Sequence, residues 1–440
     1  MIIVSTILFA LRFFMGNPTI PGVYPYYYLL SSSQSGYGIF HLFVSFLHLS
    51  FRGYWVVSIL GTLLLFALFY NLLHIHHRHP VFVFASVFLF VLTPTTLYLS
   101  AFFGPYLFAL ILLCFVLLLI RSNHPLIAGV PFIGLLFFDQ LVFFCTITLI
   151  ATYLAFLERR NTIFWFLFAS FFSYITRSIF FWPPVFQPIS EQHLFISLFS
   201  DLGGLYGVGF FVIILGIIGI AQSWQSKKIF LPAYLSLLVF FVIYQSLSPL
   251  ALLFFYPLII FFAASGFLYF WERDWSLPLV RFLTLALILY GVLFSGISYI
   301  GHTASLPPTP LVFDSLDWFR IHAPSSSVVL SHPSRGFWLS YGSGLVPFVD
   351  YTHSDFALRS GIASELFASR DIKKTIPLLE HYNISFIWID PAMKNGEVWR
   401  GNDEGILFLF RNERFKRVYN QNGIEIWMFD LNRRNIKDPS

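Results

Sequence analysis

Acidic residues and cysteines are scarce in this chain of 440 residues: the first 300 residues hold only six carboxylates, and the whole chain has two cysteines. Cys114 and Cys145 both lie within apolar runs, which excludes a disulfide framework and a CxxC metal or redox site. Only 11% of the residues are charged, 57% are hydrophobic, and the mean hydropathy is +0.76. This composition excludes a soluble globular protein and indicates a membrane protein with several spans.

Charge is distributed unevenly along the chain. Fifteen of the 26 Lys and Arg, and fifteen of the 21 Asp and Glu, lie beyond residue 300. We therefore predict a multi-pass α-helical membrane domain over residues 1–303 and a soluble external α/β domain over residues 304–440. The sequence pI of about 9.1 comes partly from Lys and Arg in short loops, which report topology, and we expect the lipid bilayer and not nucleic acid as a partner.

A transmembrane helix needs roughly 17 to 25 mainly apolar residues. By this criterion the chain has about eleven candidate spans, some of them short. They are 2–15, 54–73, 80–98, 102–120, 125–138, 140–157, 162–176, 205–222, 230–246, 250–270 and 279–300.

The Lys and Arg residues of the short loops predict the orientation of these spans. With a cytoplasmic N-terminus, the loops on that side hold Arg78, Arg121, Arg159, Arg160, Lys227, Lys228 and Arg273, with Arg281 just inside the next span. The opposite loops hold only Arg52 and Arg177. This asymmetry follows the positive-inside rule and places the C-terminal domain outside the cell, in a plasma membrane protein.

Two external loops, 16–53 and 177–204, exceed the usual length of about 2 to 8 residues for a connection between helices. In the first, Tyr26 and Tyr27 could contact a sugar or a lipid phosphate, although Tyr is also enriched at membrane interfaces without any such role. Three of the six carboxylates, Asp139, Glu191 and Asp201, fall on this same external side. A carboxylate close to lipid is costly unless it is paired, solvated or used, so we regard these three as catalytic candidates.

The second external loop brings a cation, an imidazole and two acids together in sequence. Arg177 could bind a phosphate, and His193 lies close to Glu191. Each carboxylate could hold a divalent metal or act as a base. Asp201 has an equally good structural interpretation, because it precedes a new span and Asp is a good helix N-cap.

Beyond residue 308 the sequence alternates between helical and strand patterns. Residues 312–322 and 371–382 favour helices, while 328–331 and 384–389 favour strands. A hairpin is predicted over 418–429, around the turn Asn420-Gln421-Asn422-Gly423. These elements predict a small sheet covered by helices.

Several segments of the C-terminal region resemble segments of a known protein family. Leu316-Asp317-Trp318-Phe319, Val328-Val329-Leu330-Ser331, Gly336-Phe337-Trp338-Leu339 and Tyr382 through Ile389 resemble the external domain of archaeal oligosaccharyltransferase catalytic subunits. Ile189-Ser190-Glu191 is similar to the Val-Ser-Glu motif of that family, and His332-Pro333-Ser334-Arg335-Gly336 stands at the place of its Trp-Trp-Asp-Tyr-Gly motif. The family belongs to the GT-C superfamily of membrane glycosyltransferases.

The resemblance implies transfer of a sugar or glycan from a polyprenyl-phosphate or dolichyl-phosphate donor to a protein or glycan acceptor at the external face. It implies that Glu191 or Asp201 acts as base, that Arg177 and Arg335 bind the lipid phosphate, and that Tyr26 and Tyr27 line the donor entrance. A divalent cation, Mg or Mn, is a possible cofactor. A catalytically inactive relative that binds lipid-linked glycan or a partner enzyme is the main alternative, and a transporter is a third.

Overall fold

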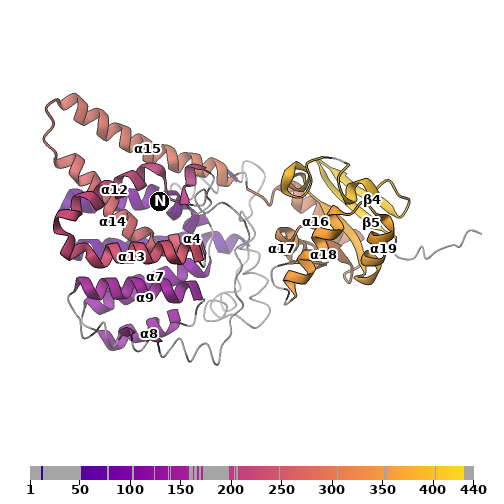
Figure 1. The fold of residues 1–440 in the computed structure, drawn as a ribbon, viewed down its shortest axis with the longest axis horizontal. Helices are drawn as coiled ribbons and strands as arrows, with labels where there is room; N and C mark the ends of the chain where they lie inside the picture. The colour runs from indigo at the N-terminus through magenta and orange to yellow at the C-terminus, as the bar shows by residue number, and fades with distance from the viewer. Residues whose placement is uncertain are drawn as a thin grey trace, which may run out of the picture. The chain divides into compact units, whose positions relative to one another are not determined.

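The computed structural model of the chain describes residues 11–12, 51–76, 79–101, 104–122, 124–136, 138, 140–157, 162, 166–167, 170–171, 198–202, 204, 207–246, 248–304, 306–350, 353, 355–401 and 403–430. These residues divide into two compact units: a helical unit that extends to Ala304, and a C-terminal unit that follows it (Figure 1).

The helical unit consists of apolar helices. They are α4 (Phe51–His76), α5 (Pro80–Leu92), α6 (Pro94–Ala101), α7 (Pro105–Arg121), α8 (Pro125–Leu136), α9 (Gln140–Phe156), α12 (Phe210–Ser223), α13 (Lys227–Ser246), α14 (Ala251–Glu272) and α15 (Pro278–Ala304). Within the described ranges, four helices are long and apolar enough to cross a membrane, or five if the bent pair α5 and α6 is one span. The unit is therefore that of a membrane protein.

Most of the predicted spans coincide with a helix. Each span predicted between residues 54 and 157, and between 205 and 300, has a helix at its place. The predicted spans 2–15 and 162–176 lie largely outside the described residues, so the number eleven stays a prediction.

The third predicted span, 80–98, is broken into α5 and α6, which meet at an angle of 54° around Thr93. Pro94 begins α6 and cannot donate the backbone hydrogen bond that would continue α5. Tyr256 of α14 donates its hydroxyl proton to the carbonyl of Phe90 at 2.7 Å and shares a 2.8 Å hydrogen bond with Thr96. The Tyr256 hydroxyl thus satisfies a backbone carbonyl near the break, as apolar surroundings require, and the Thr96 hydroxyl bonds to it.

Helices α12 and α14 approach so closely that their backbones touch. A Cβ atom at Gly219 would lie 1.9 Å from the carbonyl oxygen of Phe262, and a Cβ atom at Gly266 would lie 2.1 Å from that of Leu215. Small residues at a crossing are the usual way for membrane helices to gain van der Waals contact. The two glycines therefore fix the position of α14, which also contacts α5, α13 and α9.

The C-terminal unit is an α/β domain. Its helices are α16 (Pro310–His322), α17 (Gly336–Trp338), α18 (Phe356–Ala368), α19 (Ile372–His381) and α20 (Ile406–Leu409), with shorter helical turns η3 (Pro333–Arg335), η4 (Leu339–Ser343) and η5 (Met393–Glu397). Its strands are β1 (Val328–Leu330), β2 (Val346–Pro347), β3 (Ile384–Ile389), β4 (Phe415–Gln421) and β5 (Ile424–Phe429). The sheet order is β2-β1-β3-β5-β4, with β2, β1 and β3 parallel and the last two strands antiparallel.

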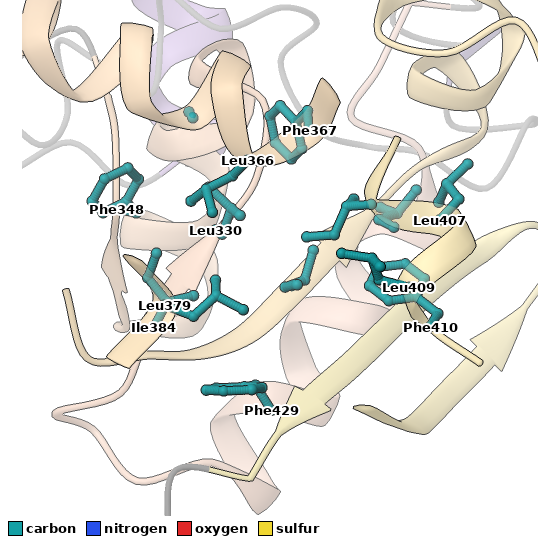
Figure 2. Close-up of a cluster of buried hydrophobic side chains, with 14 of the residues drawn as sticks. Leu330, Phe348, Leu366, Phe367, Leu379, Ile384, Leu407, Leu409, Phe410 and Phe429 are labelled. Atoms are coloured by element: carbon teal, nitrogen blue, oxygen red, sulfur yellow. The ribbon is translucent and has the colours of Figure 1, made fainter. Parts of the chain in front are cut away.

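Alternate side chains of β3 pack against different layers, as the pleat of a strand requires. Ile387 and Ile389 belong to the core on the side of α18, α19 and α20, where Leu366 and Leu379 are buried with them (Figure 2). On the other side Trp388 donates its indole N–H to Ser315 of α16 at 3.0 Å. The central strand is thus covered on both faces, which explains why its sequence is almost continuously apolar.

The predicted hairpin is present as β4 and β5, joined by Asn422 and Gly423. Both residues have positive φ, 48° and 83°, as a two-residue hairpin turn of the Asn-Gly kind demands. The helices expected at 312–322 and 371–382 and the strands expected at 328–331 and 384–389 also lie where predicted, within about two residues.

Candidate functional site

Of the eight predicted site residues, the structure describes Asp201 and Arg335. The other six lie outside the described residues: Tyr26, Tyr27, Asp139, Arg177, Glu191 and His193. Their roles stay predictions. Asp201 belongs to the helical unit and Arg335 to the C-terminal unit.

Asp201 lies in a short helical turn, η1 (Ser200–Leu202), before α12. Its carboxylate accepts a hydrogen bond from the backbone N–H of Phe210, the first residue of α12, at 2.6 Å. Its other oxygen accepts from the hydroxyl of Ser295 of α15 at 2.5 Å. Asp201 therefore caps α12 from a separate turn and ties it to α15, which agrees with the structural interpretation of this residue.

The capping role predicts how two substitutions at Asp201 differ. Asp201→Ala should lower the free energy of unfolding by about 1 kcal/mol, because α12 loses its cap. Asp201→Asn should stay close to wild type, because an amide oxygen still accepts from Phe210 and the Ser295 hydroxyl can reverse its direction. Thermal unfolding of the two variants measures the difference, and equal losses of stability would contradict the role.

Arg335 is buried in a network of charged side chains. Its Nε donates to Asp390 at 2.7 Å, its Nη2 to Glu397 at 2.6 Å, and its Nη1 to the hydroxyl of Ser334 at 2.6 Å. The side chains of Arg335 and Asp390 are only 8% and 7% exposed. Two carboxylates thus compete with any phosphate for this guanidinium, so the observed contacts support a structural role and the predicted donor-binding role of Arg335 stays untested.

His332 joins the same network. Its Nδ1 lies 2.7 Å from the Ser334 hydroxyl and 3.3 Å from Glu397. Burial lowers the pKa of His332, because desolvation of the charged imidazolium outweighs the attraction of the nearby carboxylates. The imidazole is therefore neutral at pH 7.

Gly336 is the residue that this segment shares with the family motif. Sterics explain why this position is a glycine. A Cβ atom there would lie 2.4 Å from Cβ of Asp350 and 2.7 Å from the carbonyl oxygen of Val349. Asp350 is itself buried and hydrogen-bonds with its Oδ1 to His353 Nδ1 at 2.9 Å. Gly336 therefore lets the chain after β2 pass directly against the turn that carries Arg335.

The pair of Asp350 and His353 predicts a dependence of stability on pH. The hydrogen bond to Asp350 raises the pKa of His353. Protonated His353 then stabilises the folded domain fully below the unfolded pKa of about 6.5, and this contribution is lost as the pH rises through the raised pKa. Thermal melts between pH 5.5 and 8.5 should show this loss in the wild type and not in His353→Gln, with the exposed His381→Gln as control.

No group of three or more His, Cys, Asp or Glu side chains that could hold a metal is present in the described part of the chain. Two of the three predicted acids, Asp139 and Glu191, lie outside that part. The described residues therefore offer no donor set for a divalent cation, so Mg or Mn stays a prediction and we derive no step that passes through one.

Sequence reasoning missed Asp390 and Glu397, the partners of Arg335. One signal was available: Asp390 directly follows β3, at the carboxyl end of a parallel strand, where polar groups of α/β sheets converge. Glu397 had no such signal, since η5 brings it to Arg335 only through tertiary structure.

Comparison with known proteins shows the fold. No family model and no curated protein matches the sequence. Three crystal structures of the oligosaccharyltransferase of Archaeoglobus fulgidus match the structure: its complex with Zn and sulfate, with 14% identity over 97% of this chain and 72% of that one and a TM-score of 0.60; its apo form, with 12% over 99% and 74% and a TM-score of 0.60; and a form tethered to an acceptor peptide with the NVT sequon, with 12% over 89% and 69% and a TM-score of 0.57. Over nearly its whole length, this chain has the fold of the Archaeoglobus fulgidus oligosaccharyltransferase.

Proposed function

We propose that this protein is a membrane glycosyltransferase that moves a sugar or glycan from a polyprenyl-phosphate or dolichyl-phosphate donor to an acceptor at the external face of the cell membrane. One observation carries the proposal: the likeness to the archaeal oligosaccharyltransferase covers 97 to 99% of the chain in two of the matched structures. A fold alone does not define an activity, so the chemistry has to come from named residues.

In the proposed reaction an acceptor hydroxyl or amide attacks the anomeric carbon of the donor sugar. The bond from that carbon to the phosphate oxygen breaks, the lipid phosphate leaves, and the acceptor proton passes to a carboxylate. Both oxygens of Asp201 are occupied by Phe210 and Ser295, so we assign the base to Glu191. Arg177 would neutralise the charge that develops on the leaving phosphate.

The remaining predicted residues have supporting roles in this proposal. Tyr26 and Tyr27 would line the donor entrance, and His193 would contact the donor phosphate beside Glu191. Asp139 is retained as a second acid on the external side. The matched oligosaccharyltransferase was crystallised in complex with Zn and sulfate, and a divalent cation for this chain stays a proposal with no step assigned to it. The external position of loops 16–53 and 177–204 follows from the positive-inside rule.

The test is transfer by the purified protein in lipid nanodiscs, with a radiolabelled polyprenyl-phosphate sugar as donor and with peptide and oligosaccharide acceptors. We expect label in an acceptor together with free lipid phosphate, and about a hundredfold slower transfer in Glu191→Gln, since general base catalysis contributes on this order. Glu272→Gln is the matched control, because Glu272 is half-exposed and its one ion pair with a described residue is with His79 at 3.2 Å. Donor binding without transfer to any acceptor would instead identify a non-catalytic relative.

A further inference from the structure

The C-terminal unit contains a pocket of about 480 Å³. This volume lies within the range of small-molecule sites, roughly 300 to 1,000 Å³. One wall is a single face of α18, where Ser360, Ala363, Ser364 and Phe367 follow each other at spacings of three and four residues. The opposite lining comes from the turn after β1 and from residues 397–405.

The buried network around Arg335 gives the pocket a fixed polar floor. Ser334 accepts from Arg335, so its own hydroxyl proton is directed to His332 Nδ1. The proton of the neutral imidazole is then on Nε2, which has no partner among the described residues and is available as a donor. Glu397, held by Arg335, contributes an acceptor to the same floor.

The walls combine free hydroxyls with apolar surface, which comes from the exposed Ala368 and the partly buried Val398. Ser360 and Ser364 make no hydrogen bond to any described residue, and Ser364 is exposed. Phe367 and Trp399 meet edge to face at 5.3 Å, and the indole N–H of Trp399 donates to the backbone of Phe367 at 2.9 Å. Both rings are nearly fully buried, at 4% and 2% exposure, and support the wall from behind. Hydroxyls, a carboxylate and an imidazole beside apolar carbon suit a ligand that has both hydroxyl groups and an apolar ring face.

The charged side chains at the pocket, and the lack of a strand in its lining, narrow the class of ligand further. Three carboxylates, Asp390, Glu397 and Glu404, face two guanidinium groups, Arg335 and Arg370, at and directly below the pocket. This negative excess disfavours an anionic ligand. None of the lining residues belongs to a strand, so an extended peptide has no sheet edge to join there.

We propose that this pocket binds a neutral carbohydrate, one or two sugar rings in size, as part of the acceptor. The identification as acceptor rests on the proposed glycosyl transfer, whereas the binding of the sugar rests on the pocket alone. The sugar hydroxyls would bond to Ser360, Ser364, His332 and Glu397, and a ring face would lie against the accessible apolar carbon of Ala368 and Val398.

The experiment measures binding to the full-length protein in nanodiscs, without donor, by saturation-transfer NMR. The probes are neutral disaccharides of glucose, galactose and mannose, a disaccharide with one uronic acid, and a short uncharged peptide. We expect at least one neutral disaccharide to bind, and the uronate and the peptide to bind at least tenfold more weakly. Absence of binding by every neutral disaccharide, or equal binding of the uronate or the peptide, would overturn the proposal.

Two variants localise the binding. Ser364→Leu fills the pocket from an exposed position and should weaken binding of the neutral disaccharide at least tenfold; the double variant Ser360→Ala with Ser364→Ala should weaken it less. Glu365→Leu, the adjacent exposed residue of α18 outside the pocket, is the control and should bind as the wild type does. Unchanged binding in Ser364→Leu would exclude the pocket. Sugar binding without transfer would refute the proposed function, and with it the identification of the sugar as acceptor, but not the sugar site. Transfer without sugar binding would refute only this inference.

Discussion

Gly219→Ala is expected to destabilise the helical unit by about 3 kcal/mol, the upper end of the usual cost of overpacking. The added Cβ would lie 1.9 Å from the carbonyl oxygen of Phe262 and 3.0 Å from the backbone nitrogen of Gly266. Neither atom can move without shifting α14, because each belongs to a helix backbone. Helices α12 and α14 must therefore separate along their whole contact, which also disturbs the packing of α14 against α5 and α13.

Thermal unfolding in detergent measures this loss, and Gly301→Ala is the matched control. Gly301 belongs to α15, and a Cβ atom there would meet nothing within 4 Å. The control should be neutral or should gain up to about 1 kcal/mol from the higher helix propensity of Ala. Equal melting temperatures for the two variants would show that the α12 and α14 contact does not limit the stability of the unit.

Local sequence patterns were enough to predict part of the C-terminal unit, namely α16, α19, β1, β3 and the hairpin of β4 and β5, but not α18 or β2. Ile384 to Ile389 is a run of mostly apolar, β-branched and aromatic residues, and it forms β3 over the same residues. Asn422 and Gly423 tolerate positive φ, and they form the predicted turn. These predictions succeeded because each depends on the chemistry of neighbouring residues and not on contacts between distant ones.

The helices of the membrane unit were predictable by hydropathy, whereas their breaks and contacts were not. The span 80–98 has the length of one helix, yet Pro94 and the hydroxyl of Tyr256, 162 residues further along the chain, stabilise a bend within it. Gly219 and Gly266 similarly have meaning only as a pair across two helices. Hydropathy sums over a window and contains no information on which helix lies beside which.

The candidate site shows the same division between local and distant information. For Asp201 the sequence left cap and catalyst equally open, and the structure supplies a capping hydrogen bond from the Phe210 N–H and a second bond from the Ser295 hydroxyl of α15. For Arg335 the role of a phosphate ligand was implied by the family resemblance of the segment around it. The two carboxylates beside it come from positions 55 and 62 residues further along the chain, beyond the reach of any sequence window.

Arg335→Met is expected to destabilise the C-terminal unit by about 3 to 5 kcal/mol, which is the usual cost of removing one partner from a buried ion pair. Asp390 and Glu397 would remain without a counter-charge, and Asp390 is only 7% exposed. The substitution also removes the stacking of the guanidinium on Trp338, whose ring centre lies 5.0 Å away. Arg411→Met is the control: Arg411 and Asp403 are 70% and 67% exposed, so its loss should cost at most about 1 kcal/mol.

A triple variant separates the structural role of Arg335 from phosphate binding. Arg335→Met combined with Asp390→Asn and Glu397→Gln removes all three charges, so it should regain most of the stability that the single variant loses. If Arg335 serves only the fold, this variant should bind a radiolabelled polyprenyl-phosphate sugar as the wild type does. A stable triple variant that has lost donor binding would show that the guanidinium contacts the phosphate despite its two carboxylate partners. In that case the loss of donor binding could not be explained by a loss of stability.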